Sequence, residues 1–179
     1  MNRSYFAATD IWRIPQTVII DVLEEMAIDG SRGNEGIALF LGRHEGTTAE
    51  VTHLVKLRGP GIQKHPDQIR ITAALLNEVT DVAIENEVCL IGQVHSHGPG
   101  HYVDLSPTDR AFGIKTPYYL SLVAPDYAMS EALFKDWGVH VYTENHEYER
   151  LPIHEVDRRI QFVSSISLPF LIVGGENGF

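Results

Sequence analysis

The chain has 179 residues, 44% of them hydrophobic, and a formal net charge of −10 at pH 7. This size fits one domain with a self-sufficient core. The negative net charge and the lack of a dense Lys/Arg cluster argue against a nucleic-acid-binding protein. A single cysteine, Cys89, permits no internal disulfide, and no apolar run approaches the roughly 20 residues of a membrane span. Because the first residues also lack the apolar core of a signal peptide, we expect a cytoplasmic protein with neither membrane nor nucleic-acid partners.

Apolar periodicity in the first half of the chain predicts a mixture of helices and strands. Residues 1–13 are mixed in composition and are predicted as an N-terminal extension, which either forms an edge strand or frays. After them the pattern predicts, in order, a helix, two strands and a long helix, at residues 15–30, 36–41, 51–57 and 67–86. Residues 42–48 are predicted to turn the chain between the two strands.

The second half predicts mainly strands, with a helix that starts at Ser106. The predicted strands, of which the last two form a hairpin, lie at residues 88–94, 118–123, 139–142 and 148–153. Residues 158–164 fit either a short helix or a strand. Residues 154–179 are predicted as a C-terminal extension whose apolar part, 167–175, forms a terminal strand, packs on the domain or, if exposed, recruits a partner by strand addition. The order of elements predicts an α/β fold, in which two long helices flank a sheet.

The residues from His95 to Asp109, with the sequence HSHGPGHYVDLSPTD, carry the candidate chemistry. They follow the predicted buried strand, and on an extended chain residues two apart point to the same side. His95 and His97 could therefore hold one metal ion together, and Asp109 could add an oxygen ligand. Two imidazoles and one carboxylate would leave one tetrahedral position open, which is how catalytic zinc is held.

Each part of this motif also has a plain structural explanation. A His-x-His pair on a strand is often only packing or a polar rim. Ser106 to Asp109 matches a helix capping box with proline at the first helical position, and such a cap would also fix Asp109 rigidly. His101 is either an exposed loop residue or a further ligand or substrate contact, and Asp104 would compete with Asp109 if the register shifted. The other six histidines have no ligand spacing and are assigned no role.

The motif resembles that of the JAMM (MPN+) metallopeptidase family, in which H-x-H is followed by S-x-x-D. Far upstream, that family has a glutamate just before a Gly-x-x-Leu-x-x-Gly-like strand. Here the upstream element is Asn34-Glu35-Gly36-Ile37-Ala38-Leu39-Phe40-Leu41-Gly42. The resemblance spans roughly residues 14–153 and implies a single domain with a mixed central sheet, in which a short helix carries the Ser-x-x-Asp motif.

The resemblance also implies roles for five residues. His95, His97 and Asp109 would bind one Zn²⁺ per chain. Glu35 would activate the metal-bound water as general base and acid, and Ser106 would stabilise the transition state. Taken alone, Glu35 would be an ordinary surface carboxylate at a loop–strand junction.

The spacing after the second histidine departs from the family pattern. Eight residues separate His97 from Ser106, one more than is usual. The extra residue must bulge out of the turn Gly98-Pro99-Gly100 if Ser106 and Asp109 are to reach the metal.

Members of the family hydrolyse amide bonds, most often the isopeptide bond between a ubiquitin-like protein and a lysine. The resemblance therefore implies a zinc isopeptidase that removes or trims a ubiquitin-like protein, similar to small prokaryotic members encoded beside E1-like and E2-like enzymes in conjugation or antiviral-defence operons. Two alternatives stay open. One is the same chemistry on a sulfur-carrier protein or a small amino-acid conjugate, and the other is a non-catalytic MPN-like scaffold that binds a partner.

Overall fold

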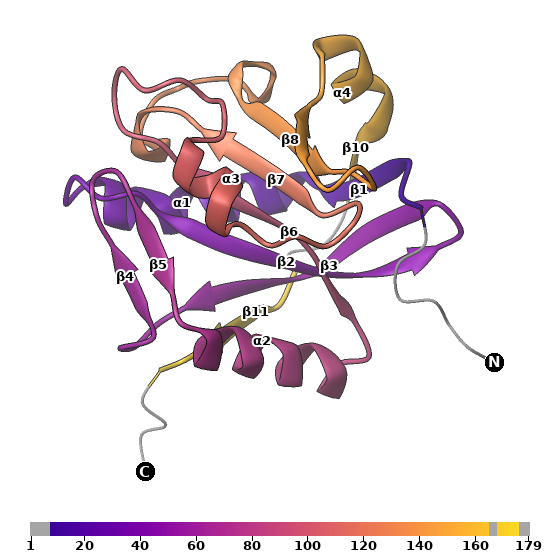
Figure 1. The fold of residues 1–179 in the computed structure, drawn as a ribbon, viewed down its shortest axis with the longest axis horizontal. Coiled ribbons are helices and arrows are strands. Elements are labelled where there is room, and N and C mark those ends of the chain that lie inside the picture. The colour runs from indigo at the N-terminus through magenta and orange to yellow at the C-terminus, as the bar shows by residue number, and fades with distance from the viewer. Residues whose placement is uncertain (1–7, 165–167, 176–179) are drawn as a thin grey trace.

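A computed structural model describes residues 8–164 and 168–175 and shows a mixed α/β fold built on a curled nine-stranded sheet (Figure 1). The strands follow one another in the order β10-β1-β3-β2-β6-β7-β8-β9, and β11 also pairs with β3. They are β1 (Ile11–Pro15), β2 (Ile37–Glu45), β3 (Thr48–Leu57), β6 (Cys89–Ser96), β7 (Leu120–Ala124), β8 (Gly138–Tyr142), β9 (Tyr148–Arg150), β10 (Ile160–Val163) and β11 (Phe170–Val173). The sheet contains both parallel pairs, such as β6 with β7, and antiparallel pairs, such as β2 with β6, so it is mixed as predicted.

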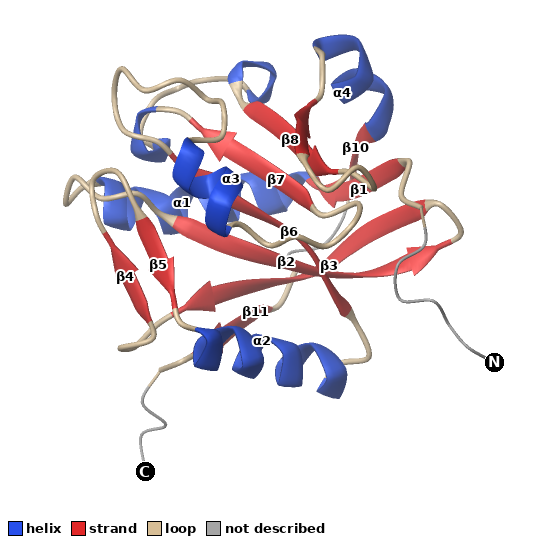
Figure 2. Cartoon of the chain, viewed as in Figure 1, coloured by secondary structure: helices blue, strands red, loops and turns tan. Residues whose placement is uncertain are grey.

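Helices cover both faces of this sheet (Figure 2). They are α1 (Gln16–Gly30), α2 (Ala73–Glu85), α3 (Pro107–Phe112) and α4 (Ile153–Arg159), with short 3₁₀ turns at η1 (Asp126–Ala128) and η2 (Phe134–Asp136). Side chains alternate along β2, so Ala38 and Phe40 join the core under α1, whereas Ile37 and Leu39 join the core under α2. A third cluster on the α2 face contains Leu105, Tyr119 and Val123 and lies beside α3.

The structure corrects two predictions in the first half of the chain. Strand β2 does not turn at Gly42 but continues to Glu45, because a register shift after Leu41 lets its pairing with β3 go on to a tight turn at Gly46, where φ is 58°. The second long helix begins at Ala73 rather than near Asp67, since the preceding residues form the hairpin β4 (Ile62–Lys64) and β5 (Ile69–Ile71). Thr72 caps that helix by accepting a hydrogen bond from the Leu75 amide.

Both predicted terminal extensions contribute strands to the sheet. Strand β1 lies between β3 and β10 rather than at an edge, and the segment 158–164, for which helix and strand both fitted, contains the end of α4 followed by β10. The apolar tail forms β11, parallel to β3. Residues 1–7, 165–167 and 176–179, on which part of the extension predictions rested, lie outside the described residues. No described helix has both the length and the apolar character needed to cross a membrane.

Candidate metal centre

The two histidines of the H-x-H motif come from the end of β6, in the middle of the sheet. Along this strand Val94 joins the core under α1, so His95 points to the opposite face. His97 directly follows the strand, and its amide donates to the Ala124 carbonyl of β7 over 2.9 Å, which keeps the chain extended for one more residue. Both side chains are buried, with 2% exposure for His95 and 5% for His97.

Asp109 reaches the histidines because the loop after His97 folds back over the sheet. Residues Gly98 to His101 form a turn closed by the His101 amide and the Gly98 carbonyl at 3.1 Å. Pro99 occupies its second position and Gly100, with φ of 77°, its third, which is the residue pattern of a type II turn. The additional residue predicted from the spacing is thus accommodated, and α3 carries Asp109 to the histidine pair.

Three ligand atoms converge on one point. Nε2 of His95 lies 3.2 Å from Nε2 of His97, and Oδ2 of Asp109 lies 3.3 Å from His97 Nε2 and 3.6 Å from His95 Nε2. At metal–ligand distances of 2.0–2.1 Å, the corners of a tetrahedron are about 3.3–3.4 Å apart. His95, His97 and Asp109 are therefore spaced as three ligands of one tetrahedral ion, and this donor set fits zinc among other divalent metals.

The ring of His97 is oriented by a backbone carbonyl. Its Nδ1 lies 2.8 Å from the Tyr102 carbonyl oxygen, which can only accept, so Nδ1 carries the proton. The lone pair of the neutral imidazole is then on Nε2, the atom that faces the triad. Metal-binding histidines are commonly held in this way. His95 has the Gln93 amide beside its own Nδ1, at 3.5 Å.

The charges of the triad depend strongly on one another. Burial raises the pKa of the Asp109 carboxyl, but the hydrogen bonds with His95 and His97 outweigh burial and hold that pKa well below its usual range. Burial lowers the pKa of His97, yet the hydrogen bonds to Asp109 and to the Tyr102 carbonyl raise it overall. Asp109 is therefore an ionised carboxylate at neutral pH, in the form that a cation needs.

Glu35 lies beside this triad, immediately before β2. Its side chain is only 4% exposed, and burial raises its pKa to about 8, with the charges of Asp109 and Asp67 adding to the effect and His97 opposing it. Its amide donates to the His65 carbonyl over 2.9 Å, and the next residue, Gly36, packs its Cα against Met26 of α1. Glu35 is thus a buried carboxylate close to the ligands, rather than the surface residue that its local sequence favours.

Ser106 forms the predicted capping box with Asp109. Its Oγ accepts from the Asp109 amide at 3.1 Å, and its own amide donates to Asp109 Oδ2 at 2.8 Å. The cap uses a lone pair of the hydroxyl oxygen, and hydrogen bonding from Ser106 helps to lower the pKa of the Asp109 carboxyl. Because the cap itself does not use the O–H bond, it is compatible with the catalytic role expected for Ser106.

Two further loop residues were considered as ligands from the sequence. The triad contains neither His101, which is exposed, nor Asp104. Asp104 instead accepts hydrogen bonds from His140 Nε2 and from the Arg110 guanidinium, each at 2.8 Å. Burial lowers the pKa of His140 to about 4, so this histidine is neutral at pH 7 and the contact is a hydrogen bond rather than an ion pair.

Arg110 and His140 are structural supports that the sequence analysis missed. Besides Asp104, the Arg110 guanidinium donates to the carbonyls of Leu105 and Tyr148. One side chain thereby ties the loop after His97 and the start of α3 to strand β9. In the sequence, the only indication of this role is that Arg110 directly follows the candidate ligand Asp109, and that indication is weak.

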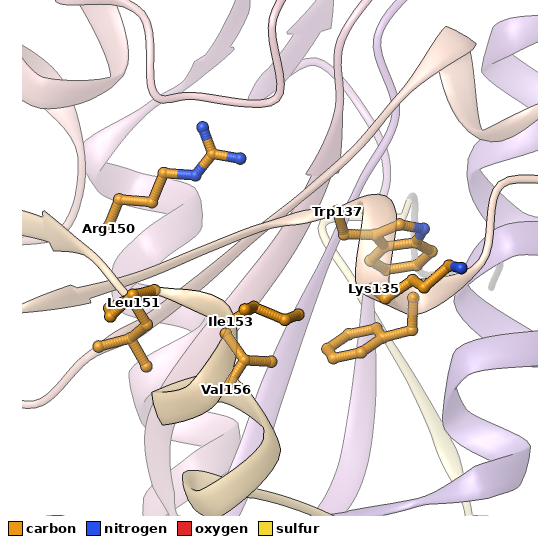
Figure 3. Close-up of a pocket in the computed structure, with 8 residues that line it drawn as sticks. Lys135, Trp137, Arg150, Leu151, Ile153 and Val156 are labelled. Atoms are coloured by element: carbon orange, nitrogen blue, oxygen red, sulfur yellow. The ribbon is translucent and has the colours of Figure 1, made fainter.

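A groove of about 460 Å³ runs alongside the triad. It contains His95 and Asp109, and its walls come from β5, α2, α3 and the start of β7, including Ile69, Leu76 and Phe112. A second cleft, of about 340 Å³, lies near α4 on the α1 face of the sheet, where Ile153 and Val156 lie between Leu151 and Lys135 (Figure 3). It contains none of the candidate site residues, so the groove beside the triad is the candidate binding site.

Comparisons with known proteins bear on the fold alone. No protein-family model matches the sequence, and no curated protein matches it. Among solved structures, the chain is similar to the solution structure of protein DSY2949 from Desulfitobacterium hafniense, with a TM-score of 0.60 over 87% of this chain and 95% of that chain. The two sequences are 15% identical. A likeness at this level of identity shows a common fold and says nothing about activity.

Proposed function

We propose that this chain is a JAMM-type zinc metallopeptidase that hydrolyses the isopeptide bond between a ubiquitin-like protein and its conjugate, or trims a ubiquitin-like precursor. One observation carries the proposal: the ligand atoms of His95, His97 and Asp109 lie 3.2–3.6 Å from one another, as around one metal ion. The buried carboxylate of Glu35 beside them supports a hydrolytic rather than a purely structural role.

The residues of the site have complementary roles in this proposal. A zinc ion held by His95, His97 and Asp109 would supply a water nucleophile that is active at neutral pH. Glu35 would accept the proton of the attacking water and deliver it to the leaving amine, and its buried carboxylate beside the triad supports this role. Ser106 donates its hydroxyl proton to the oxygen of the attacked carbonyl as negative charge develops there.

The surroundings of the triad favour a polypeptide substrate over a small amino-acid conjugate. The groove beside it has isoleucines of β5 and Leu76 of α2 along its wall, and it continues past His95 to α3. Two aromatic side chains project from the segment that carries the site, Tyr102 with 88% exposure and Phe112 with 86%. Large exposed aromatic groups are typical of surfaces that bind another protein.

The test combines metal analysis with cleavage of a conjugate. Purified wild-type protein should hold close to one zinc per chain and cleave a ubiquitin-like protein from a lysine-linked conjugate. Glu35→Ala should keep the zinc and lose cleavage, because Glu35 lies near the metal but is not among its ligands. Cleavage that persists in Glu35→Ala contradicts the assigned mechanism.

The same experiment separates the two alternatives. Offering a sulfur-carrier protein and a small amino-acid conjugate in parallel identifies a different substrate by its turnover. Failure of the purified protein to hold near-stoichiometric zinc would favour the non-catalytic scaffold. Wherever the protein is encoded, neighbouring genes for E1-like or E2-like enzymes and a ubiquitin-like protein would support the isopeptidase.

A further inference from the structure

The turn after β7 has an unusual backbone conformation. Asp126, Tyr127 and Ala128 are consecutive residues with φ angles of 52°, 55° and 60°. The left-handed conformation costs an L-residue roughly 1–2 kcal/mol, and three such residues in a row need strong support from their surroundings. Strain of this kind is found preferentially at functional sites.

The support comes first from the backbone of the metal ligand His97. The His97 amide donates to the Ala124 carbonyl at 2.9 Å, and the Tyr127 amide donates to the His97 carbonyl at 2.7 Å. Both polar backbone groups of His97 are therefore bonded to the segment that ends β7 and forms the turn. The Tyr127 amide makes the second of these bonds in the left-handed conformation.

The side chain of Tyr127 is packed between two glycines. A Cβ atom at Gly98 would lie 2.8 Å from the Tyr127 hydroxyl oxygen, and one at Gly30, the last residue of α1, would lie 2.9 Å from the Tyr127 Cβ. Both distances are shorter than a Cβ atom normally keeps from another heavy atom. The ring therefore lies directly on the chain next to His97, and its hydroxyl extends to the β4–β5 loop, where it donates to the Pro66 carbonyl at 3.0 Å.

That loop is also bonded to Glu35. The residue before Pro66, His65, accepts the hydrogen bond from the Glu35 amide at 2.9 Å. The residue after it, Asp67, is near enough for its charge to raise the pKa of Glu35. The loop from His65 to Asp67 thus runs beside the Glu35 carboxylate, whose exposure is only 4%.

We propose that Tyr127 is a positioning residue, whose phenol holds the His65–Pro66 loop against Glu35 while its amide holds the backbone of His97. Tyr127 thereby fixes the distance between the proposed general base and the metal ligands. The part of this inference that concerns turnover rests on the function proposed above. The part that concerns the Glu35 backbone does not.

The test is Tyr127→Phe, which removes the hydroxyl but keeps the ring against Gly98. One hydrogen bond contributes about 1 kcal/mol, so hydrogen exchange of the Glu35 amide should become roughly fivefold faster. The zinc content should be unchanged, because Tyr127 supplies no ligand. In a cleavage assay kcat should fall by a similar factor of about five at unchanged KM, since the groove residues are untouched.

Two further variants make the result decisive. Tyr118→Phe is the matched control: it removes a phenol hydroxyl that pairs with Glu144, away from the site, and should change neither amide exchange nor kcat. Gly98→Ala adds a methyl group that should push the Tyr127 ring out of place. This variant should therefore also make hydrogen exchange of the Glu35 amide faster.

The outcomes separate this inference from the proposed function. Unchanged exchange of the Glu35 amide in both Tyr127→Phe and Gly98→Ala overturns the positioning role, whatever the activity. If the wild type cleaves no conjugate while the exchange responds as expected, the proposed function fails and the Tyr127 contact to the loop stands.

Discussion

The amide of Ser106 donates to Oδ2 of Asp109, the same oxygen that faces both histidines. The capping box of α3 and the candidate metal site therefore share one atom. A helix cap is worth about 1 kcal/mol, and here the same contacts also fix the direction of a ligand oxygen. The two functions that the Ser-x-x-Asp pattern suggested do not compete with each other.

Because the cap and the candidate metal site share Oδ2 of Asp109, substitutions of Ser106 and of Asp109 should have different effects on stability and zinc binding. Ser106→Ala keeps the amide that orients Asp109 but loses the hydroxyl, so the protein should become less stable by about 1 kcal/mol while it still binds zinc. Asp109→Asn should lose most of its zinc, because the amide oxygen carries no charge. Thermal unfolding and metal analysis of both variants check this, and loss of zinc from Ser106→Ala would contradict it.

Metal binding should stabilise the folded protein. A ligand that binds only the folded state adds about 2.7 kcal/mol at a concentration one hundred times its Kd, so wild-type Tm should rise with zinc and fall with a chelator. His97→Ala should lack this response because the tetrahedral set loses a member. His101→Ala is the matched control, since His101 lies outside the triad and is exposed. A loss of the response in His101→Ala would show that this histidine is a ligand.

The raised pKa of Glu35 predicts how the stability of the metal-free protein depends on pH. Between the ordinary pKa of 4.5 and about 8, folded Glu35 retains a proton that the unfolded chain releases. The unfolded state then binds fewer protons, so the free energy of unfolding falls as pH rises through this interval. Glu35→Gln cannot ionise, so its free energy of unfolding should fall less with pH. At pH 8 it should exceed that of the wild type by about 4 kcal/mol, from the two pKa values of Glu35 at about 1.4 kcal/mol per pH unit.

Urea denaturation with chelator present, at several pH values, measures this difference. Glu24→Gln is the control, because Glu24 is an exposed carboxylate on α1 and should leave the pH profile unchanged. Parallel profiles for wild type and Glu35→Gln would show that the Glu35 carboxylate ionises normally in the fold. Active sites commonly contain residues that serve function at the expense of folding stability.

The sequence was informative where one local pattern determined the structure around the candidate ligands. The alternation along β6 was enough to put His95 and His97 on one side, and the cap at Ser106 was visible in four residues. It was uninformative where contacts join distant segments. Strands of three residues such as β4 and β5 carry too little periodicity to detect, and the parallel pairing of β1 with β10 and of β11 with β3 depends on residues far apart in the chain.

The supports of the site were hidden for the same reason. Tyr127 is an unremarkable residue of a turn until Gly30, Gly98 and Pro66 are brought to it by folding. His140 has no neighbour in sequence that would explain its burial, because its partner Asp104 is on another segment. Side chains that act through tertiary contacts leave no periodic signal.

Arg110 should be such a support for the metal ligands. Its guanidinium donates to Asp104, Leu105 and Tyr148 at once, an arrangement that the single ammonium of a lysine cannot reproduce. Arg110→Lys should therefore loosen the start of α3 and weaken zinc affinity by roughly tenfold, as expected when groups that orient metal ligands are lost. Competition with a zinc chelator of known affinity measures this. The control is Arg43→Lys, at an exposed position of β2, which should leave the zinc affinity unchanged. A zinc affinity of Arg110→Lys equal to that of the wild type would mean that the capping box alone holds Asp109 in place.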